Sequence, residues 1–399
     1  MSAAALIPSQ QEPAHGPLED LEFHPSAENS VGVELELQIL DRDTGDLSSG
    51  AVRLLAACAE EGLEGVSAEF MQSQLEIKTG ICHNVAALRT ALIPLLRRVR
   101  FIANSLGYDL GLGGTHPFNR AANSAVFPAE RYQRIQDQMA WLTHQGLVFG
   151  LHVHVGVAGG DMAIGVMNTL VQYLPHLLAL SASSPFWGGI DTGLASVRSA
   201  LSRMIPHGGL PHYFANWKDF CTYCRVMHDC RAIQATKDIH WDIRPRPQLG
   251  TVEFRICDMP LTLGRVFGLT ALLRTLTIAS QRLLEQRPKM RQGDRRHYWI
   301  AVENKWLATR YGLDAKCIRT PGGKRRGLTE DVARLLEQMR PTAAETGDAD
   351  FLASLQSQEK LETGSDRLRG LYRETGDWRA LIEEMKTPWV RELEEGKRS

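Results

Sequence analysis

The sequence contains few cysteines. Seven of them are scattered over 399 residues without regular spacing, and an odd number argues against a disulfide framework. The first thirty residues also lack the apolar run that is typical of a signal peptide. These absences predict a protein of the reducing cytoplasm.

An excess of charge of either sign is absent as well. The chain has 45 Lys and Arg against 46 Asp and Glu, which gives a formal net charge of −1. Proteins dedicated to nucleic acid need a surplus of basic side chains to neutralise phosphates, so no nucleic-acid partner is expected. The most apolar stretch, residues 162–180, is interrupted by polar side chains and a proline. This pattern predicts a buried helix and argues against a membrane partner.

The chain shows neither an internal repeat nor a low-complexity block. Residues 1–29 have no periodicity and are predicted to form a disordered tail. Residues 30–399 are predicted to form a single domain with a helical C-terminal part, about 313–399. Helical periodicity is found over residues 86–106, 161–182, 264–286, 294–310, 328–339 and 376–396.

Other segments alternate strictly between apolar and polar residues, as strands with one covered face do. They are residues 31–39, 74–78, 147–157, 239–244 and 252–257. With the helices, they predict an α+β fold that contains an antiparallel sheet. The polar faces of these strands hold few Ser or Thr and are rich in ionisable side chains, namely Glu34, Glu36, Glu76, His152, His154, Arg244, Glu253 and Arg255.

If these strands share one sheet, several carboxylates converge on one face. Like charges at such spacing repel one another, and arginines or divalent cations would neutralise them. Carboxylates with an occasional imidazole suit Mg²⁺ or Mn²⁺, and a ligand set without thiolate argues against structural zinc. If only the strand with Glu34 and Glu36 is considered, a solvated glutamate pair is the favoured interpretation. Four strands with ionisable polar faces favour a metal site instead.

A second cluster consists of Cys221, Cys224, His228 and Cys230. Four nitrogen or sulfur ligands within ten residues could bind zinc, but zinc sites usually draw two ligand pairs from separate segments. Free thiols on a helix or loop are therefore the favoured interpretation.

Seven motifs occur in the order found in one known family. They are Ser30-Val-Gly-Val-Glu-Leu-Glu36, Gln74-Leu-Glu-Ile-Lys-Thr79, Gly113-Gly-Thr-His-Pro-Phe118, Leu151-His-Val-His-Val-Gly156, Ser184-Pro-Phe-Trp-Gly-Gly-Ile-Asp-Thr-Gly193, Trp241-Asp-Ile-Arg-Pro245 and Gly250-Thr-Val-Glu-Phe-Arg255. With these motifs the chain resembles the type 2 glutamate–cysteine ligases, also called carboxylate–amine ligases. The resemblance extends from residue 30 to about residue 312.

The resemblance implies a glutamine-synthetase-like catalytic domain, in which an antiparallel sheet curves into a funnel or half-barrel backed by helices. Mg²⁺ (or Mn²⁺) and ATP would bind its concave face. The implied reaction is ATP-dependent amide formation on glutamate through an acyl phosphate, with cysteine or another amine as the acceptor. Because the sequence has no Walker A motif, metal ions and arginines of the sheet would have to hold ATP.

The resemblance also implies roles for individual residues. Arg255 would neutralise the transferring phosphoryl group, and Glu253 would be both a catalytic residue and the last metal ligand. The other implied metal ligands are Glu34, Glu36, Glu69, Glu76 and His152. Glu69 and Glu76 differ in strand parity, so a bulge or turn near residues 72–73 is expected between them.

Four further residues are candidates for binding substrate or nucleotide: Arg198, Arg244, His154 and Thr115. A metal-dependent hydrolase remains as an alternative function, suggested by His152 and His154 beside the carboxylates; it would use a catalytic water and need no ATP. A homodimer is also expected, because helix-rich exteriors often form symmetric contacts.

Overall fold

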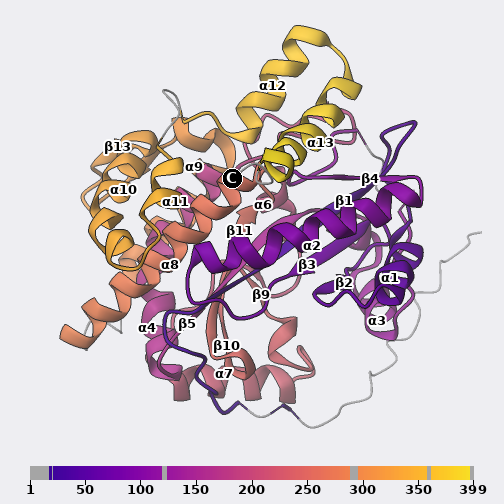
Figure 1. The fold of residues 1–399 in the computed structure, drawn as a ribbon. Helices are drawn as coiled ribbons and strands as arrows, with labels where there is room; N and C mark the ends of the chain where they lie inside the picture. The colour runs from indigo at the N-terminus through magenta and orange to yellow at the C-terminus, as the bar shows by residue number, and fades with distance from the viewer. Residues whose placement is uncertain (1–17, 20, 119–123, 288–294, 357–360, 396–399) are drawn as a thin grey trace, which may run out of the picture.

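The computed structural model describes residues 18–19, 21–118, 124–287, 295–356 and 361–395. Within them, an antiparallel sheet lies at the centre of the protein and helices pack around it (Figure 1). The strand order is β10–β11–β5–β1–β3–β2, and β4 also pairs with β1. The bounds are Val31–Asp41 (β1), Val66–Ala68 (β2), Gln74–Lys78 (β3), Tyr108–Gly111 (β4), Gly150–Gly156 (β5), Ile243–Arg246 (β10) and Thr251–Asp258 (β11). The predicted α+β class is confirmed.

Helices separate and follow the strands. Their bounds are Ala51–Glu60 (α1), Val85–Ser105 (α2), Glu130–Met139 (α3), Gly160–Leu170 (α4), Leu174–Ser181 (α5), Val197–Ser202 (α6), Trp217–Asp229 (α7), Leu263–Gln286 (α8), Arg295–Tyr311 (α9), Leu328–Glu345 (α10), Ala349–Ser354 (α11), Gly364–Thr375 (α12) and Trp378–Glu395 (α13). Short strand pairs join Phe186–Trp187 (β6) to Ile190–Asp191 (β7), Gly208–Gly209 (β8) to His240–Trp241 (β9), and Lys316–Ile318 (β12) to Arg325–Gly327 (β13).

Two predicted elements are divided in the structure. The helix expected over 161–182 is α4 and α5, separated by a 3₁₀ turn over Val171–Tyr173 immediately before Pro175. Proline lacks the N–H that a continuous helix needs, and it is tolerated in the first turn of α5. The strand expected over 239–244 is β9 and β10, because β9 pairs with β8 and not with β11.

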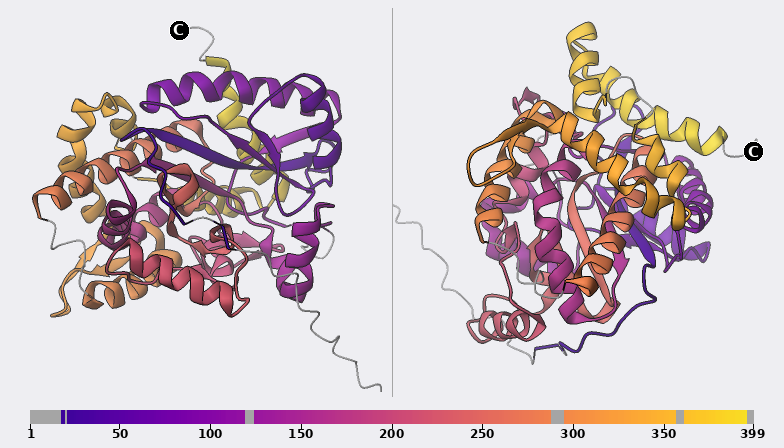
Figure 2. Two further views of the ribbon diagram at one scale, coloured as in Figure 1. Left: turned by 90° about the horizontal axis from the view of Figure 1, so that it is seen from below. Right: turned by 90° about the vertical axis from the view of Figure 1, so that its left-hand side faces the viewer.

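The apolar half of each strand's alternation forms the core. Leu35, Leu37, Ile77, Val153 and Phe254 are fully buried. Helices α2, α4, α5 and α8 pack against this side of the sheet (Figures 1 and 2). Burial of each such side chain contributes about 1.5–3 kcal/mol to the stability of the fold. Because side chains alternate along a strand, the polar residues then lie on the opposite face of the sheet.

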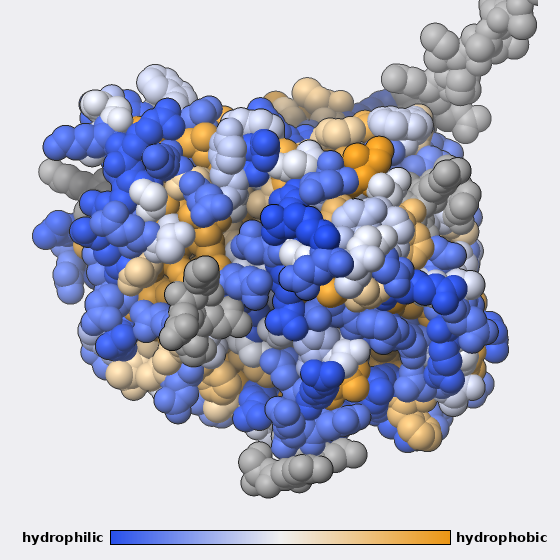
Figure 3. Space-filling model, turned by 90° about the horizontal axis from the view of Figure 1, so that it is seen from above, coloured by the Kyte–Doolittle hydropathy of each residue, from blue (hydrophilic) through white to orange (hydrophobic). Residues whose placement is uncertain are grey.

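The stretch Gly160–Ser181 is long and apolar enough to cross a membrane, and the described residues contain no other such stretch. Its most apolar window is 78% buried inside the protein, where α4 and α5 pack against α8 and the sheet. The predicted buried segment therefore lies in the core. The face seen in Figure 3 is mostly hydrophilic, with apolar areas scattered between charged side chains.

The prediction of a free tail is corrected for residues 21–29, while residues 1–17 and 20 lie outside the described residues. Leu21 is buried, and its carbonyl accepts a hydrogen bond from Trp217 Nε1 at 3.2 Å. The His24 amide donates to the carbonyl of Pro247, in the turn between β10 and β11. Gly250 in that turn has φ +64°, and a Cβ there would clash with the His24 carbonyl, so glycine lets the segment lie against the turn.

Among its described residues, the C-terminal region is mainly helical apart from the β12–β13 hairpin, which periodicity did not predict. Leu368, Leu381, Ile382 and Met385 of α12 and α13 form a second, smaller apolar cluster that includes Phe186 of β6. At its far end, α13 supports the main core: the Glu392 carboxylate accepts hydrogen bonds from the first two amides of α8.

Candidate active site

The sheet register places the charged side chains of five strands side by side on the face opposite α2, α4, α5 and α8. Directly paired residues on neighbouring strands lie about 5 Å apart, within reach of one another's side chains. The register pairs Glu36 with Glu76, Glu34 with both His152 and Lys78, and Glu253 with both His154 and Arg244.

Two groups of side chains in the described part of the protein are arranged to hold a cation. Ligand atoms of Glu34, Glu76 and His152 lie within 4.8 Å of one another, as do those of Glu34, His154 and Glu253. The Nε2 atoms of both histidines are buried and have no hydrogen-bond partner among the described residues. Carboxylate oxygens with such a free imidazole nitrogen are suitable ligands for Mg²⁺ or Mn²⁺. The residues therefore fit a divalent cation.

Burial and neighbouring charges set the protonation of these groups. Burial, reinforced by the charge of Arg255, lowers the pKa of His152 to about 3, so the imidazole is neutral. Burial alone would raise the pKa of Glu34, but hydrogen bonds with His152 and His154 hold that pKa far below its ordinary value. Glu34, the carboxylate common to both groups, is therefore ionised.

Three other carboxyl groups behave in the opposite way. Burial, followed by repulsion from a neighbouring carboxylate, raises the pKa of Glu36, Glu69 and Glu76 to about 7 in each case. Arginines near Glu36 and Lys78 near Glu76 offset part of this effect. At neutral pH these groups therefore hold protons that a divalent cation could replace.

Glu253 is fully buried among three guanidinium groups. Its carboxylate accepts hydrogen bonds from Arg244 Nε at 2.8 Å and Nη2 at 3.1 Å, from Arg246 Nη1 at 3.0 Å and from Arg255 Nη1 at 2.6 Å. Burial would raise the pKa of Glu253, but the charges of Arg244 and Arg255 keep that pKa well below its ordinary value. Three positive charges around one negative charge leave the cluster attractive to an anion.

A cavity of about 140 Å³ opens beside these clusters. Glu36 and Glu69 line one part of it, and Arg198, Arg255 and Asp242 line another. Residues of α3 complete the wall. The cavity therefore brings carboxylates and arginines together around a space large enough for small substrate groups.

Arg198 of α6 reaches the cavity by crossing the start of β5 at Gly150. Its Nη2 donates to the carbonyl of Arg255 at 3.1 Å, and its Nε is buried without a partner among the described residues. A Cβ on Gly150 would collide with the Arg198 guanidinium, so the glycine makes room for that group. The Oδ1 atom of Asp258 lies 3.9 Å from Arg198 Nη1 and forms an ion pair with the guanidinium.

The sequence matches glutamate–cysteine ligase family 2 (GCS2) over residues 30–386. The chain belongs to this family. A relative from Thermobifida fusca named "Putative glutamate–cysteine ligase 2" is 37% identical over 367 residues, which cover 91% of each chain. A relative of the same name from Gloeobacter violaceus is 36% identical over 366 residues, covering 91% of this chain and 98% of the relative. The protein is therefore a ligase, and the hydrolase alternative is set aside.

Solved structures agree with the fold. A glutamate–cysteine ligase from Francisella tularensis, crystallised in complex with AMP, aligns with a TM-score of 0.66 at 13% identity and covers 94% of this chain and 90% of that chain. A bifunctional glutathione synthetase from Pasteurella multocida also gives a TM-score of 0.66 at 13% identity, covering 91% of this chain and 52% of that chain. The fold expected from the family resemblance is therefore confirmed.

Three of the residues predicted to bind substrate or nucleotide make contacts with other parts of the ligase. Arg244 is buried, its guanidinium donates to Glu253 and to the carbonyls of Lys237 and Ile239, and it is not among the residues that line the cavity. His154 belongs to a cation group instead. Its Nδ1 lies 3.2 Å from the hydroxyl of Thr251.

Thr115 lies in the core and is not among the residues that line the cavity. Its hydroxyl donates to the carbonyl of Phe186 at 2.9 Å and so anchors the β6–β7 hairpin.

Glu69, in contrast, does line the cavity. β2 runs antiparallel to β3, and Ser67 lies opposite Glu76. Glu69 is two residues after Ser67 and therefore shares the face of Glu76. The turn expected near residues 72–73 is present between them.

Sequence reasoning missed other charged residues of the ligase's site. Arg246 continues the alternation of β10 beyond Pro245, a signal that could have been followed. Asp242 lies on the polar face of the same segment and lines the cavity. Lys305 lies in a segment, residues 304–306, that fits the family resemblance, but its partner could not be predicted, because only tertiary packing of α9 brings its Nζ to 2.6 Å from Asp242 Oδ2.

The cysteine cluster does not form a metal site in the described residues. Cys221 and Cys224 are buried on one side of α7, whereas Cys230 is exposed beyond its end. Burial raises the pKa of Cys224 to about 12 and also raises that of Cys221, which keeps both as thiols.

Proposed function

We propose that this ligase joins the γ-carboxylate of glutamate to the amine of cysteine or another acceptor, using ATP and passing through an acyl phosphate. The observation that carries the proposal is the pair of carboxylate–imidazole groups beside a cavity that also presents Arg198 and Arg255. The reaction brings a carboxylate close to a triphosphate and so concentrates negative charge. Arginines, together with a cation held by the carboxylate–imidazole groups, would neutralise that charge. Similarity to a glutamate–cysteine ligase crystallised with AMP supports the choice of nucleotide.

Mg²⁺ or Mn²⁺ would be held by the two groups that share Glu34. Glu36 and Glu69 line the cavity next to them and are proposed as further ligands. Bound there, a divalent cation would neutralise phosphate oxygens and orient the triphosphate. Within this proposal Glu253 has two functions, because it contributes to one cation group and also holds Arg255 in place.

The chain's own residues would act on substrate binding and on the first step. When the glutamate carboxylate attacks the γ-phosphorus and the bond to ADP breaks, the Arg255 guanidinium stabilises the charge on the transferring group. Arg198 would bind a carboxylate of glutamate. In the second step the amine attacks the acyl carbon, the carbon–oxygen bond to phosphate breaks, and the nitrogen loses a proton to the departing phosphate or to solvent.

Trapping the acyl phosphate tests the proposal directly. Purified enzyme with ATP, Mg²⁺, glutamate and hydroxylamine should form glutamyl hydroxamate, and a panel of amines including cysteine should then identify acceptors that release phosphate. Hydroxamate formation must require both ATP and glutamate. Failure to form it with any donor carboxylate tested, or turnover of a substrate by water without ATP, would contradict the proposal.

The location and assembly of the enzyme are also proposed. All seven cysteines are free thiols in the structure, which supports the reducing cytoplasm as its compartment. A homodimer is proposed from the helix-rich exterior alone, and size-exclusion chromatography with light scattering would test it.

Replacing Gly150 with Ala should weaken binding of glutamate. The new Cβ would displace the Arg198 guanidinium, a flexible group, so the fold should persist while KM for glutamate rises about tenfold, equivalent to roughly 1.4 kcal/mol. Gly32→Ala is the matched control on the same face, since a Cβ there is 3.5 Å from its nearest neighbour. Equal KM values for both variants and the wild type, measured by steady-state kinetics, would remove Arg198 from substrate binding.

The stabilisation that a cation provides should grow with pH. Because the pKa values of Glu36, Glu69 and Glu76 are raised to about 7, the cation-free folded protein retains protons that the unfolded chain releases above its ordinary pKa near 4.5. These groups therefore favour folding at low pH and oppose it increasingly as pH rises through 7. A cation replaces the protons and removes the penalty.

Thermal denaturation with EDTA and with Mn²⁺ at pH 6 and pH 8 would measure this effect. The increase in Tm on adding Mn²⁺ should be several degrees larger at pH 8 than at pH 6. The same comparison in Glu76→Gln should show a smaller pH dependence. An increment that is constant with pH in the wild type would argue against a cation bound by these carboxylates.

A further inference from the structure

An irregularity in β11 holds the guanidinium of Arg198. Phe254 lies opposite Val153 of β5, whereas Cys257 lies opposite Leu151, so three residue steps along β11 correspond to two along β5. Such a β-bulge leaves backbone groups without partners on the neighbouring strand. Two carbonyls of the bulge accept hydrogen bonds from the guanidinium, the carbonyl at position 255 from Nη2 at 3.1 Å and that at position 256 from Nη1 at 3.4 Å.

The same bulge changes which side chains of β11 share the charged face of the sheet. Before the bulge, Glu253 lies opposite His154, and after it Asp258 lies opposite Gly150. Directly paired residues lie on the same face, and His154 and Gly150 are both on the charged face of β5. Without the bulge, strand parity would place Asp258 on the core face with Phe254. The bulge therefore brings Asp258 to the side where Arg198 enters.

The Asp258 carboxylate is fully buried and is surrounded by donors. Its Oδ1 lies 3.9 Å from Arg198 Nη1 and accepts a hydrogen bond from the Ser196 hydroxyl at 2.8 Å. Its Oδ2 accepts from the Ser184 hydroxyl at 2.6 Å and from the Ser183 amide at 3.0 Å. An ionised carboxylate is an acceptor only, so this surrounding suits its charged form.

The two hydroxyls that donate to Asp258 in turn accept hydrogen bonds from the first turn of α6. Ser184 Oγ accepts from the amide of Arg198 at 3.2 Å, and Ser196 Oγ accepts from the amide of Ser199 at 3.1 Å. Ser196 is the N-cap residue of α6, and a side-chain cap fixes the start of a helix. Asp258 is therefore linked to both the guanidinium and the backbone of Arg198.

Two glycines allow this arrangement. A Cβ on Gly114 would come within 2.8 Å of the Asp258 carboxyl carbon, just as a Cβ on Gly150 would collide with the Arg198 guanidinium. Gly114 belongs to the glycine-rich motif of residues 113–118, in which Thr115 does not line the cavity. The motif thus contributes to the site by making room for a carboxylate that itself lies outside the cavity.

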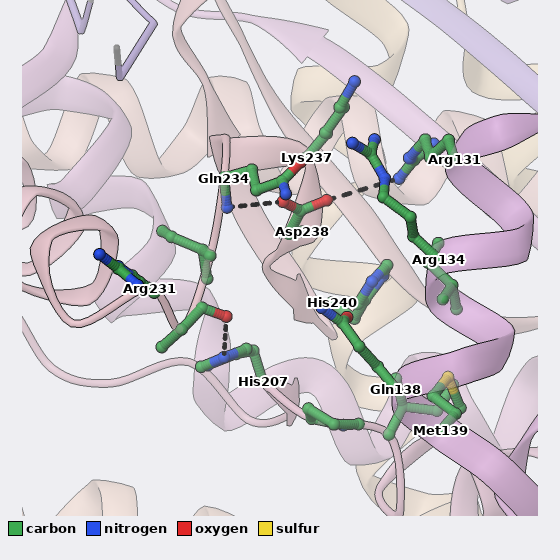
Figure 4. Close-up of a pocket in the computed structure, with 15 residues that line it drawn as sticks. Arg131, Arg134, Gln138, Met139, His207, Arg231, Gln234, Lys237, Asp238 and His240 are labelled. Atoms are coloured by element: carbon green, nitrogen blue, oxygen red, sulfur yellow. Dashed lines mark hydrogen bonds and ion pairs between the residues drawn. The ribbon is translucent and has the colours of Figure 1, made fainter. Parts of the chain in front are cut away.

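The position of α6 determines the shape of the cavity beside it. Arg198, Ser199 and Ser202 of this helix line the cavity, and the chain continues into the wall of a neighbouring hollow, which His207 lines (Figure 4). With six residues, α6 is too short to be stable by its own backbone hydrogen bonds. Its place therefore depends on the contacts at its first turn.

Resting on the proposed function, we propose that Asp258 is the positioning residue for Arg198. It contacts the guanidinium directly and, through Ser184 and Ser196, fixes the turn of α6 from which the side chain extends. Glutamate then meets an arginine that is already oriented, so less conformational freedom is lost on binding. Loss of Asp258 should weaken glutamate binding and leave phosphoryl transfer at Arg255 nearly unchanged.

Asp258→Asn tests the proposal, because it keeps the shape of the side chain and removes its charge. In the phosphate-release assay, KM for glutamate should rise about tenfold, while kcat changes less than about threefold and KM for ATP less than about twofold. A role in general stability alone would lower kcat and raise both KM values. That pattern, or an unchanged KM for glutamate, would overturn the proposal.

A double-mutant cycle measures whether Asp258 acts through Arg198. Arg198→Gln alone should raise KM for glutamate at least as much as Asp258→Asn does. The variant that carries both changes should have a KM less than about twofold above that of Arg198→Gln, because residues that act as a unit are not additive. If the two effects multiply, Asp258 acts independently of Arg198 and the proposal is wrong.

Serine variants keep the proposal testable if Asp258→Asn does not fold. Ser184→Ala and Ser196→Ala each remove one hydroxyl between Asp258 and α6, and each should raise KM for glutamate about threefold or more. Ser183→Ala is the matched control, since Ser183 is equally buried but its hydroxyl donates to the carbonyl of Met259 at 2.7 Å. Equal KM values in all three variants would contradict a connection through the serines.

A binding measurement separates this inference from the proposed function. Glutamate without nucleotide or metal should raise the Tm of the wild type and of Ser183→Ala more than that of Asp258→Asn. If hydroxamate formation fails but this difference is seen, the ligation proposal falls and the positioning role stands. If hydroxamate forms while Asp258→Asn matches the wild type in KM and in Tm shift, only the positioning role falls. A wild type that neither forms hydroxamate nor is stabilised by glutamate would overturn both.

Discussion

Arg255→Lys should reduce kcat by about a thousandfold while leaving Tm within a few degrees of the wild type. Arg255 lines the cavity, and its Nη1 donates to Glu253 at 2.6 Å and lies 3.3 Å from His152 Nδ1. Lysine keeps the charge and can still pair with Glu253. It cannot direct a planar pair of N–H groups at phosphate oxygens while it does so.

Arg246→Lys is the matched control for this experiment. Arg246 also donates to Glu253, at 3.0 Å, but it does not line the cavity. Its replacement should change kcat less than about tenfold. If the two variants have equal activities in the phosphate-release assay, the Arg255 side chain has no special role in phosphoryl transfer.

Glu253→Gln should abolish turnover and also destabilise the fold, by about 3–5 kcal/mol. Removing the single negative charge leaves Arg244, Arg246 and Arg255 close together with nothing between them to neutralise their charge. From the sequence alone the substitution is expected to leave the fold intact. The burial of Glu253 among three guanidinium groups changes that expectation.

Denaturant unfolding monitored by circular dichroism would measure the loss of stability. Glu330→Gln is the control, because Glu330 makes ion pairs with Arg334 and Arg326 at the surface and should lose no more than about 1 kcal/mol. A similar small loss for Glu253→Gln would show that the arginines do not depend on it. Activity close to the wild-type value would exclude Glu253 from the site.

Much of the sheet could be predicted because alternation is a local property. Residues 31–39, 74–78 and 252–257 lie within strands of the structure. The charged half of each pattern does face one side, so the convergence of Glu34, Glu76 and His152 followed from strand parity once a common sheet was assumed. The helices α1, α3, α6 and α7 were not predicted, and α3 provides one wall of the cavity.

The pairing of charges could not be predicted, because it depends on register and on tertiary packing. Arg244 and Arg255 look equivalent in the sequence, yet Arg244 is saturated by Glu253 and two carbonyls while Arg255 reaches the cavity. Thr115 lies in a glycine-rich motif but points into the core. Asp242 and Lys305 meet only because tertiary packing brings α9 close to the residue that precedes β10.

The segment around His24 and the end of α13 have a practical consequence. The family match covers residues 30–386. The fold's own contacts extend further, since Leu21 is buried, the His24 amide binds the β10–β11 turn, and Glu392 caps α8. A protein trimmed to the matched region would lose the support of the turn that joins Arg246 to Glu253, together with the cap of a core helix. The packed structure is therefore longer, at both ends, than the region that similarity outlines.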